Sequence, residues 1–297
     1  MEAIHWRYGE EKMVVRRKKS LITLAILILL VSYYFSQLNW ISISKEFVSL
    51  EDLPEEFDGF KIVQLADLHN KEFGEGNKRL VDKINGLEPD IIVITGDMLN
   101  NSQEIPNNGE VLVELLENLS NDYPIYYVTG EHEEGMYYED RNKYQNKGTK
   151  EEYEERLREL GITVLNDEKA TITEQDSKIN LYGLKEHLSG EMRIEHRLGK
   201  TSDDKVDILL SHRPFYFDEY VDWGADLVFS GDTHGGMIHL PFIGGVVSTE
   251  ELFPEYDGGL YHKESSLMVV SRGLGNNPVP LRVNNRPELV EIVLKSK

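Results

Sequence analysis

The sequence contains no cysteine, which excludes disulfide bonds, thiolate nucleophiles and zinc sites built on cysteine. Positive charge is also scarce, because 32 Lys and Arg stand against 53 Asp and Glu, a formal net charge of −21. Since nucleic acids are bound largely through phosphate contacts with Lys and Arg, this balance argues against a nucleic-acid partner. Hydrophobic residues still make up 40% of the 297 residues, enough for a sizeable core.

Long apolar runs are lacking too, with one exception near the N-terminus. Leu21–Phe35 carries no charged residue and follows the four cations Arg16–Lys19. Extended by its uncharged neighbours to residues 20–40, the run predicts a membrane-spanning helix. The preceding cations favour a cytoplasmic tail at residues 1–19 and a folded domain at 41–297 outside the cytoplasm. We therefore expect a single-pass protein of the cell membrane, with its folded domain extracytoplasmic.

Two other interpretations of this run stay open. A cleaved signal peptide fits its length, but the bulky Tyr33–Phe35 stands where a signal peptidase requires small residues. A buried core helix is the other alternative, and the flanking charges disfavour it. The anchor is the favoured interpretation.

The rest of the chain alternates short apolar runs with amphipathic stretches, which predicts a layered α/β domain. Strands are expected at residues 40–50, 61–66, 90–95, 124–129, 162–165, 170–173, 179–184, 206–211, 225–230, 266–271 and 288–294. Helices are expected at residues 77–87, 110–119 and 151–160, and a packed aromatic helix at 215–223. In such folds the functional residues gather just past the carboxyl ends of the strands.

Residues able to bind metal directly follow five of these strands. The motifs are Asp67-Leu68-His69, Gly96-Asp97, Gly130-Glu131-His132-Glu133, His212 and Gly231-Asp232-Thr233-His234. One such motif arises easily in a solvated turn, whereas five in succession predict a shared site. Histidine nitrogens and carboxylate oxygens suit divalent manganese, iron or zinc. Two such ions can bind a phosphoryl group and activate water, with Asp97 as the shared carboxylate and a histidine as proton donor.

In their order these motifs resemble those of the calcineurin-like metallophosphoesterases. The resemblance is greatest to their membrane-anchored bacterial branch, which includes phosphodiesterases and UDP-diacylglucosamine pyrophosphate hydrolases. It runs from about Trp40 to the C-terminus and includes Leu53–His69, Ser271–Gly275 and Arg286–Leu289. The resemblance implies a four-layer α/β/β/α sandwich of two mixed sheets, with the metal site at the sheet edges.

The resemblance also implies a role for each motif residue. The first ion would be bound by Asp67, His69, Asp97 and His234. The second ion would be bound by Asp97, Glu131, His212 and Asp232. His132 would protonate the leaving group.

Two ligand positions depart from the family pattern. Asp232 stands where the family has His, a mild change because both side chains place a ligand atom two bonds beyond Cβ. Glu131 stands where the family has Asn; it is longer, and its charge would repel phosphate. Together with Asp67 and Asp97, these carboxylates would neutralise two divalent ions. Manganese or iron is therefore favoured, with magnesium and zinc as alternatives, and weak phosphate binding is expected.

The leading interpretation is hydrolysis of a phosphodiester or phosphomonoester, lipid-linked or derived from the cell envelope, beside the membrane. A degenerate, non-catalytic metal-binding envelope protein is the alternative that Glu131 and Asp232 motivate. A third possibility is that Glu131 turns away and hydrolysis uses the first ion alone. The presence of His132 favours catalysis, because phosphate-ester hydrolysis depends on a placed proton donor.

Overall fold

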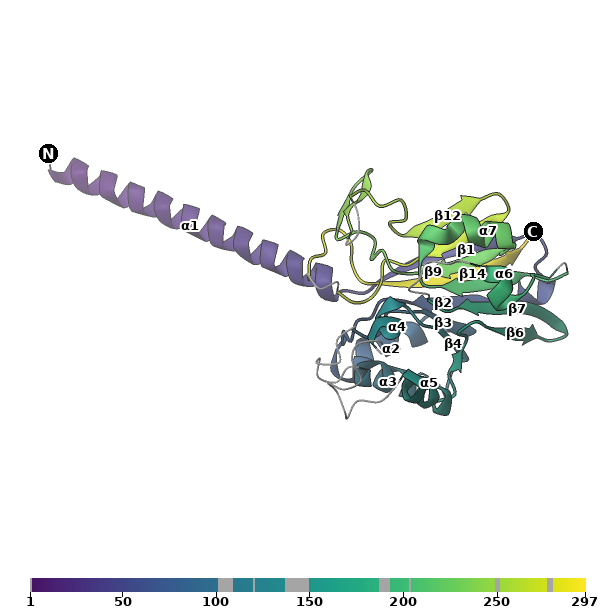
Figure 1. The fold of residues 1–297 in the computed structure, drawn as a ribbon. Helices are drawn as coiled ribbons and strands as arrows, with labels where there is room; N and C mark the ends of the chain where they lie inside the picture. The colour runs from purple at the N-terminus through teal and green to yellow at the C-terminus, as the bar shows by residue number, and fades with distance from the viewer. Residues whose placement is uncertain are drawn as a thin grey trace.

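The computed structural model describes residues 2–100, 109–119, 121–136, 150–186, 193–202, 204–248, 252–276 and 280–297. Side chains are described for these residues except 2–15, 136, 150 and 151. Two six-stranded mixed sheets pack face to face, and helices cover the outer face of each sheet (Figure 1).

The first sheet brings together strands from both ends of the domain. Its order is β1 (Ser42–Leu50), β14 (Glu288–Ser296), β2 (Lys61–Leu65), β3 (Ile91–Thr95), β4 (Ile125–Val128) and β5 (Thr163–Val164). From β2 to β5 the strands are parallel, whereas β14 is antiparallel to β2 and parallel to β1. The parallel strands are almost fully buried, which is why they read as continuous apolar runs in the sequence.

The second sheet has four parallel strands at its centre and an antiparallel strand at each edge. Its order is β12 (Gly259–Lys263), β13 (Ser266–Val270), β9 (Leu227–Ser230), β8 (Asp207–Ser211), β7 (Ser177–Leu184) and β6 (Glu168–Glu174). A separate antiparallel hairpin follows β9 and consists of β10 (Ile238–Leu240) and β11 (Gly244–Val247).

Three apolar clusters separate four layers. Helices α2 (Lys78–Asn85), α3 (Glu110–Glu117) and α5 (Lys150–Glu159) cover the first sheet, and α6 (Ile194–Leu198) and α7 (Phe217–Trp223) cover the second. In β3, Ile92 and Ile94 face the helices while Ile91 and Val93 face the other sheet, as the two-residue period of a strand requires. The four-layer α/β/β/α sandwich expected from the sequence is thus confirmed.

The predicted strands and the predicted helices of the domain are all present, with ends that differ by a few residues. The N-terminal helix, expected at residues 20–40, begins earlier, because α1 spans Glu2–Asn39 and includes most of the segment expected as a tail. The structure adds short elements that the sequence patterns did not indicate: α4 (Glu131–Met136), α6, the β10–β11 hairpin, β12, and three single-turn 3-10 helices at Glu55–Phe57, Glu75–Asn77 and Pro214–Tyr216. Elements this short carry too few residues for a recognisable apolar period.

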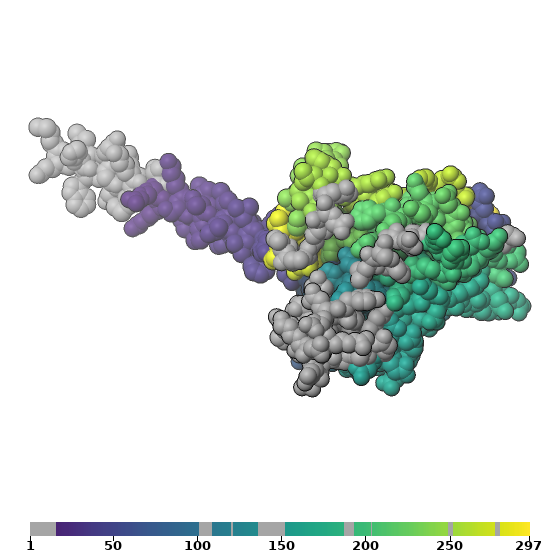
Figure 2. Space-filling model, in the orientation of Figure 1, coloured from purple at the N-terminus to yellow at the C-terminus, as the bar shows by residue number. Residues whose placement is uncertain are grey.

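The N-terminal helix α1 (Glu2–Asn39) projects away from the domain (Figures 1 and 2). Its segment Arg16–Asn39 contains an 18-residue stretch with a mean hydropathy of 2.0, and only 11% of that stretch is buried. The helix is therefore long and apolar enough to cross a membrane, and its exposure does not fit a core helix. Its last turn packs on the domain, where Gln37 and Leu38 are buried.

Candidate metal centre

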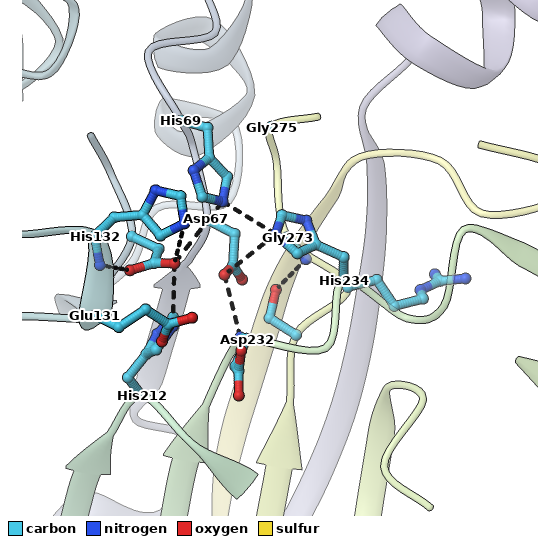
Figure 3. Close-up of polar contacts among 12 residues, drawn as sticks. Asp67, His69, Glu131, His132, His212, Asp232, His234, Gly273 and Gly275 are labelled. Atoms are coloured by element: carbon cyan, nitrogen blue, oxygen red, sulfur yellow. Dashed lines mark hydrogen bonds and ion pairs between the residues drawn. The ribbon is translucent and has the colours of Figure 1, made fainter. Parts of the chain in front are cut away.

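The structure brings the seven predicted ligands and the predicted proton donor to one place (Figure 3). All come from the segments that follow the carboxyl ends of β2, β3, β4, β8 and β9. They are Asp67, His69, Asp97, Glu131, His132, His212, Asp232 and His234. The strand directions explain why these residues lie together. Parallel strands end at the same edge of a sheet, so the residues that follow them are close in space.

The side chains form overlapping groups with the geometry of metal ligands. Each group offers one ligand atom per residue, and within a group these atoms lie within 4.8 Å of one another. The groups are Asp67–His69–His234, Asp67–Asp97–His212, Glu131–His212–Asp232 and His69–Asp97–His132. Because neighbouring groups share Asp67, Asp97 or His212, the cluster fits a pair of adjacent divalent ions rather than one isolated ion.

Several buried polar atoms of the cluster have no hydrogen-bond partner. These atoms are Asp67 Oδ2, Glu131 Oε2, His212 Nε2, Asp232 Oδ2 and His234 Nδ1. Glu131 Oε2 lies 3.1 Å from His212 Nε2, but without the alignment of a hydrogen bond. Leaving such an atom unsatisfied costs roughly 1–3 kcal/mol. Five of them in one cluster fit a site whose missing partner is a cation.

The imidazole tautomers suit metal binding. His69 Nδ1 lies 3.2 Å from Leu99 O and His212 Nδ1 lies 2.6 Å from Thr95 O. A backbone carbonyl at Nδ1 requires the hydrogen there, which leaves each Nε2 lone pair directed into the cluster. His69 Nε2 also lies 3.0 Å from His234 Nε2, an approach that a shared positive charge would stabilise.

Burial and the charges of neighbouring groups shift the pKa values of the cluster. Burial raises the pKa of Asp67 to about 8 and lowers the pKa of His69 to about 4. Burial, together with the charge of Glu131, raises the pKa of Asp232 well above its usual value. For His212, burial favours the neutral form, but its interactions with the Asp97 and Glu131 carboxylates together outweigh burial and raise the pKa. In the metal-free cluster, protons on Asp67, Asp232 and His212 thus offset part of the negative charge that divalent ions would otherwise offset.

The backbone of the cluster is unusual. Five predicted ligands have a positive φ: 52° at Asp67, 47° at His69, 53° at Asp97, 75° at Asp232 and 51° at His234. Each such residue costs about 1–3 kcal/mol and persists only where the surrounding structure enforces it. Neighbouring glycines leave the needed space, since a Cβ at Gly130 would collide with the Asp97 carboxylate. This concentration of backbone strain is typical of a functional site.

Glu133 supports the site, although the sequence analysis gave it no role. Its carboxylate is fully buried and accepts four backbone N–H groups. The donors are Asp97 N at 2.9 Å, Met98 N at 2.7 Å, Leu99 N at 3.0 Å and Gly130 N at 2.8 Å. Glu133 therefore fixes the loop that carries Asp97 to the start of α4. The signal in the sequence was an acid directly after a histidine at a buried strand end.

Arg213 lies beside Glu131. Its Nε atom is 3.6 Å from Glu131 Oε2 and 3.5 Å from Glu186 Oε1. This cation offsets part of the negative charge of Glu131. The repulsion of phosphate expected from Glu131 is correspondingly reduced.

His132 lies at the edge of the cluster. Its Nε2 atom is 3.7 Å from Asp97 Oδ2, and its ring packs edge-on against His69 with the ring centres 4.6 Å apart. Its backbone N–H donates to Asp97 Oδ1 at 2.9 Å. The side chain is partly exposed, whereas His69 and His212 are buried. It can therefore exchange protons with solvent and reach the cluster.

Comparisons with known proteins agree with this geometry. The sequence model of the calcineurin-like phosphoesterases matches residues 60–236, which include all the residues above. The chain is 34% identical over 247 residues to the uncharacterized metallophosphoesterase YkuE of Bacillus subtilis, covering 82% of each chain. It is 26% identical over 273 residues to YkoQ of Bacillus subtilis, covering 91% of this chain and 97% of YkoQ. It is also 27% identical over 264 residues to a Danio rerio transmembrane protein with metallophosphoesterase domain, covering 84% of this chain and 56% of that protein.

Proposed function

The chain belongs to the calcineurin-like phosphoesterase family, and on this premise we propose that it hydrolyses a phosphodiester or phosphomonoester with two divalent metal ions at the outer face of the membrane. Family membership and the clustered His, Asp and Glu side chains support metal-dependent phosphoester hydrolysis. The observation that carries the proposal is the set of five buried ligand atoms without hydrogen-bond partners.

The ligands divide into two sets that share Asp97. The first ion would be held by Asp67, His69, Asp97 and His234, and the second by Asp97, Glu131, His212 and Asp232. Asp97 suits the shared position, because its Oδ2 lies 4.0 Å from His69 Nε2 and 3.4 Å from His212 Nε2. When bound, such a pair of ions lowers the pKa of water and stabilises charge on the phosphoryl oxygens.

The remaining residues orient the reaction and move a proton. His132 would donate its Nε2 proton to the oxygen of the departing alcohol and recover a proton from solvent. Thr95 O and Leu99 O hold His212 and His69 in the orientation that ligands need. Arg213, close to Glu131, would help to hold the substrate phosphate.

The identity of the metal follows from the donor set. Four carboxylates with three imidazoles favour manganese or iron over zinc, and magnesium is the remaining oxygen-preferring alternative. Metal analysis after purification without added metal tests this preference, since stoichiometric zinc would contradict it.

The proposed location rests on α1. The four cations before its apolar run favour a cytoplasmic N-terminus and a catalytic domain outside the cytoplasm. The similarity to a protein named for its transmembrane segment supports a membrane anchor. A lipid-linked or envelope-derived phosphate ester is the substrate class that such a location would supply.

The test is hydrolysis of bis(p-nitrophenyl) phosphate and p-nitrophenyl phosphate by the full chain in detergent. Manganese, iron, magnesium and zinc would be supplied in turn, with His132→Ala as the control variant. We expect metal-dependent turnover that is lost in the variant while metal binding is retained. A folded, metal-loaded protein without turnover on either ester would instead support the degenerate metal-binding protein.

A further inference from the structure

Exposed apolar side chains gather at one place on the domain. Among the described residues after Leu50, six large apolar side chains are exposed, and Phe215 is the one that belongs neither to the β10–β11 hairpin with its turn nor to the segment Leu252–Phe253. The other five are Leu240, Phe242, Ile243, Leu252 and Phe253, which we call the apolar tip. Phe253 N donates to Val246 O at 3.0 Å, so this segment pairs with the β10–β11 hairpin. Exposed apolar side chains gathered on one hairpin and the segment paired with it are typical of an interaction surface.

The turn of the hairpin keeps a phenylalanine where the backbone favours glycine. Ile243 N donates to Leu240 O at 3.2 Å, with Pro241 at the second position and a φ of 68° at Phe242. These are features of a type II turn, whose third position normally holds Gly or Asn. The left-handed conformation costs Phe242 roughly 1–2 kcal/mol. Phe242 is fully exposed, so packing within the domain does not offset this cost.

Asn284 ties the hairpin to α1. Its Oδ1 accepts the Tyr33 hydroxyl at 2.6 Å, and its Nδ2 donates to His239 O at 3.2 Å. His239 N in turn donates to Val283 O at 2.9 Å. Tyr33 lies at the end of the apolar run of α1, where tyrosines concentrate at a membrane–water interface. The hairpin is therefore held at the level at which α1 would leave the lipid.

The same segment reaches the metal centre. Asn285 Nδ2 donates to His234 O at 2.7 Å, next to the Asn284 that contacts α1 and the hairpin. The strand directions agree, because β14 is parallel to β1 and antiparallel to β2. The carboxyl end of β2, which carries Asp67 and His69, thus lies at the end of the sandwich where α1 joins β1. α1 and the β10–β11 hairpin lie at the same end of the domain (Figure 1), and the strand directions place the metal centre at that end too.

We propose that the apolar tip inserts into the interfacial region of the lipid bilayer beside α1 and holds the metal centre facing the membrane surface. The inference rests on the part of the proposed function that makes α1 a membrane anchor. It identifies a docking surface for lipid and favours phosphate esters whose polar group lies at the membrane surface.

The surroundings of α1 favour lipid over a second protein. A cavity of about 450 Å³ at the junction is lined by Phe35, Trp40, Arg79 and Lys83, among others. Apolar side chains next to cations suit the boundary between acyl chains and anionic headgroups. Arg286 also lies 5.5 Å from the centre of the exposed Trp40 ring. In a chain with a net charge of −21, cations at this end complement anionic lipid.

The absence of cysteine permits a site-specific test with the full chain. Phe242→Cys would be labelled with an environment-sensitive NBD fluorophore and reconstituted into phosphatidylcholine–phosphatidylglycerol vesicles. Val31→Cys, on the apolar run of α1, serves as the lipid control. Asp176→Cys, in the exposed β6–β7 turn, serves as the water control. The vesicles would carry, or lack, lipids with a nitroxide quencher near the acyl carbonyl.

We expect a blue-shifted NBD emission at position 242 that the nitroxide lipids quench, and neither effect at position 176. A label at 242 that behaves like the label at 176 would overturn the proposal. A blue shift without quenching by lipid would also overturn it, because the tip would then lie against protein. Quenching at position 31 but not at position 242 would support the membrane anchor and refute the insertion of the apolar tip. The readout requires no hydrolysis, so the result is independent of the proposed activity.

Discussion

Glu133→Gln provides a direct test of how the site is held together. The two oxygens of Glu133 each accept two backbone N–H groups: Oε1 from Met98 and Leu99, Oε2 from Asp97 and Gly130. Glutamine has a single oxygen, so its amide NH2 would face two N–H donors. Each buried N–H that loses its acceptor costs roughly 1–3 kcal/mol. We expect the free energy of unfolding to fall by about 2–6 kcal/mol, the sum for two such groups.

Metal binding should weaken as well, because either orientation of the glutamine amide removes bonds to the loop that carries Asp97. Residues that support metal ligands typically contribute about 10–100-fold to affinity, and we expect a loss in that range. The assays are urea unfolding of the metal-free protein and calorimetric titration with manganese. Glu134→Gln is the matched control, since Glu134 is the next residue of α4 and is equally buried.

The control distinguishes a specific role from the general cost of altering a buried acid. Glu134 accepts the Thr129 hydroxyl at 2.7 Å and lies 3.3 Å from Lys185 Nζ. A glutamine oxygen can still accept from Thr129, so manganese affinity should stay close to that of the unmodified chain. Unchanged unfolding and unchanged manganese affinity in Glu133→Gln would refute the positioning role.

Three further predictions follow from the site and the apolar tip. In metal-stripped protein, burial raises the pKa of Asp67 to about 8, so the folded state retains a proton that the unfolded chain releases. The free energy of unfolding of the metal-stripped protein should fall by on the order of 5 kcal/mol as pH rises from about 4 to about 8. Urea unfolding with chelator present measures it, and a free energy that does not change with pH would contradict this. Glu131→Asn removes a negative charge beside the phosphate site and should lower the inhibition constant of inorganic phosphate roughly tenfold. Unchanged or weaker inhibition would contradict the repulsion between Glu131 and phosphate. Phe242→Gly in detergent should change stability by less than about 1 kcal/mol, because relief of the positive φ offsets the flexibility of glycine. Phe229→Ala, in the core between the sheets, should cost about 3–5 kcal/mol, and equal losses in the two variants would refute the exposure of Phe242.

Much of the site could be predicted because its residues follow the most readable elements of the sequence. Buried parallel strands are continuous apolar runs, as in Ile91–Thr95, and polar residues at their carboxyl ends stand out. Glu133 and Arg213 were harder to assign. Their partners are backbone groups or side chains from other segments, and the periodicity of the sequence does not reveal such contacts.

The sequence by itself determined the apolar helix, the alternation of strands and helices, the ligand motifs and the family. These properties are local, since each depends on residues within one element or one turn. Tertiary structure decided that β1 pairs with β14, that Asn284 contacts Tyr33 across 251 positions, and that Phe242 stays exposed. Such contacts depend on how complete layers pack against one another, and hydrophobic patterning does not encode which distant segments meet. Packing therefore placed α1, the apolar tip and the candidate metal centre at one end of the domain.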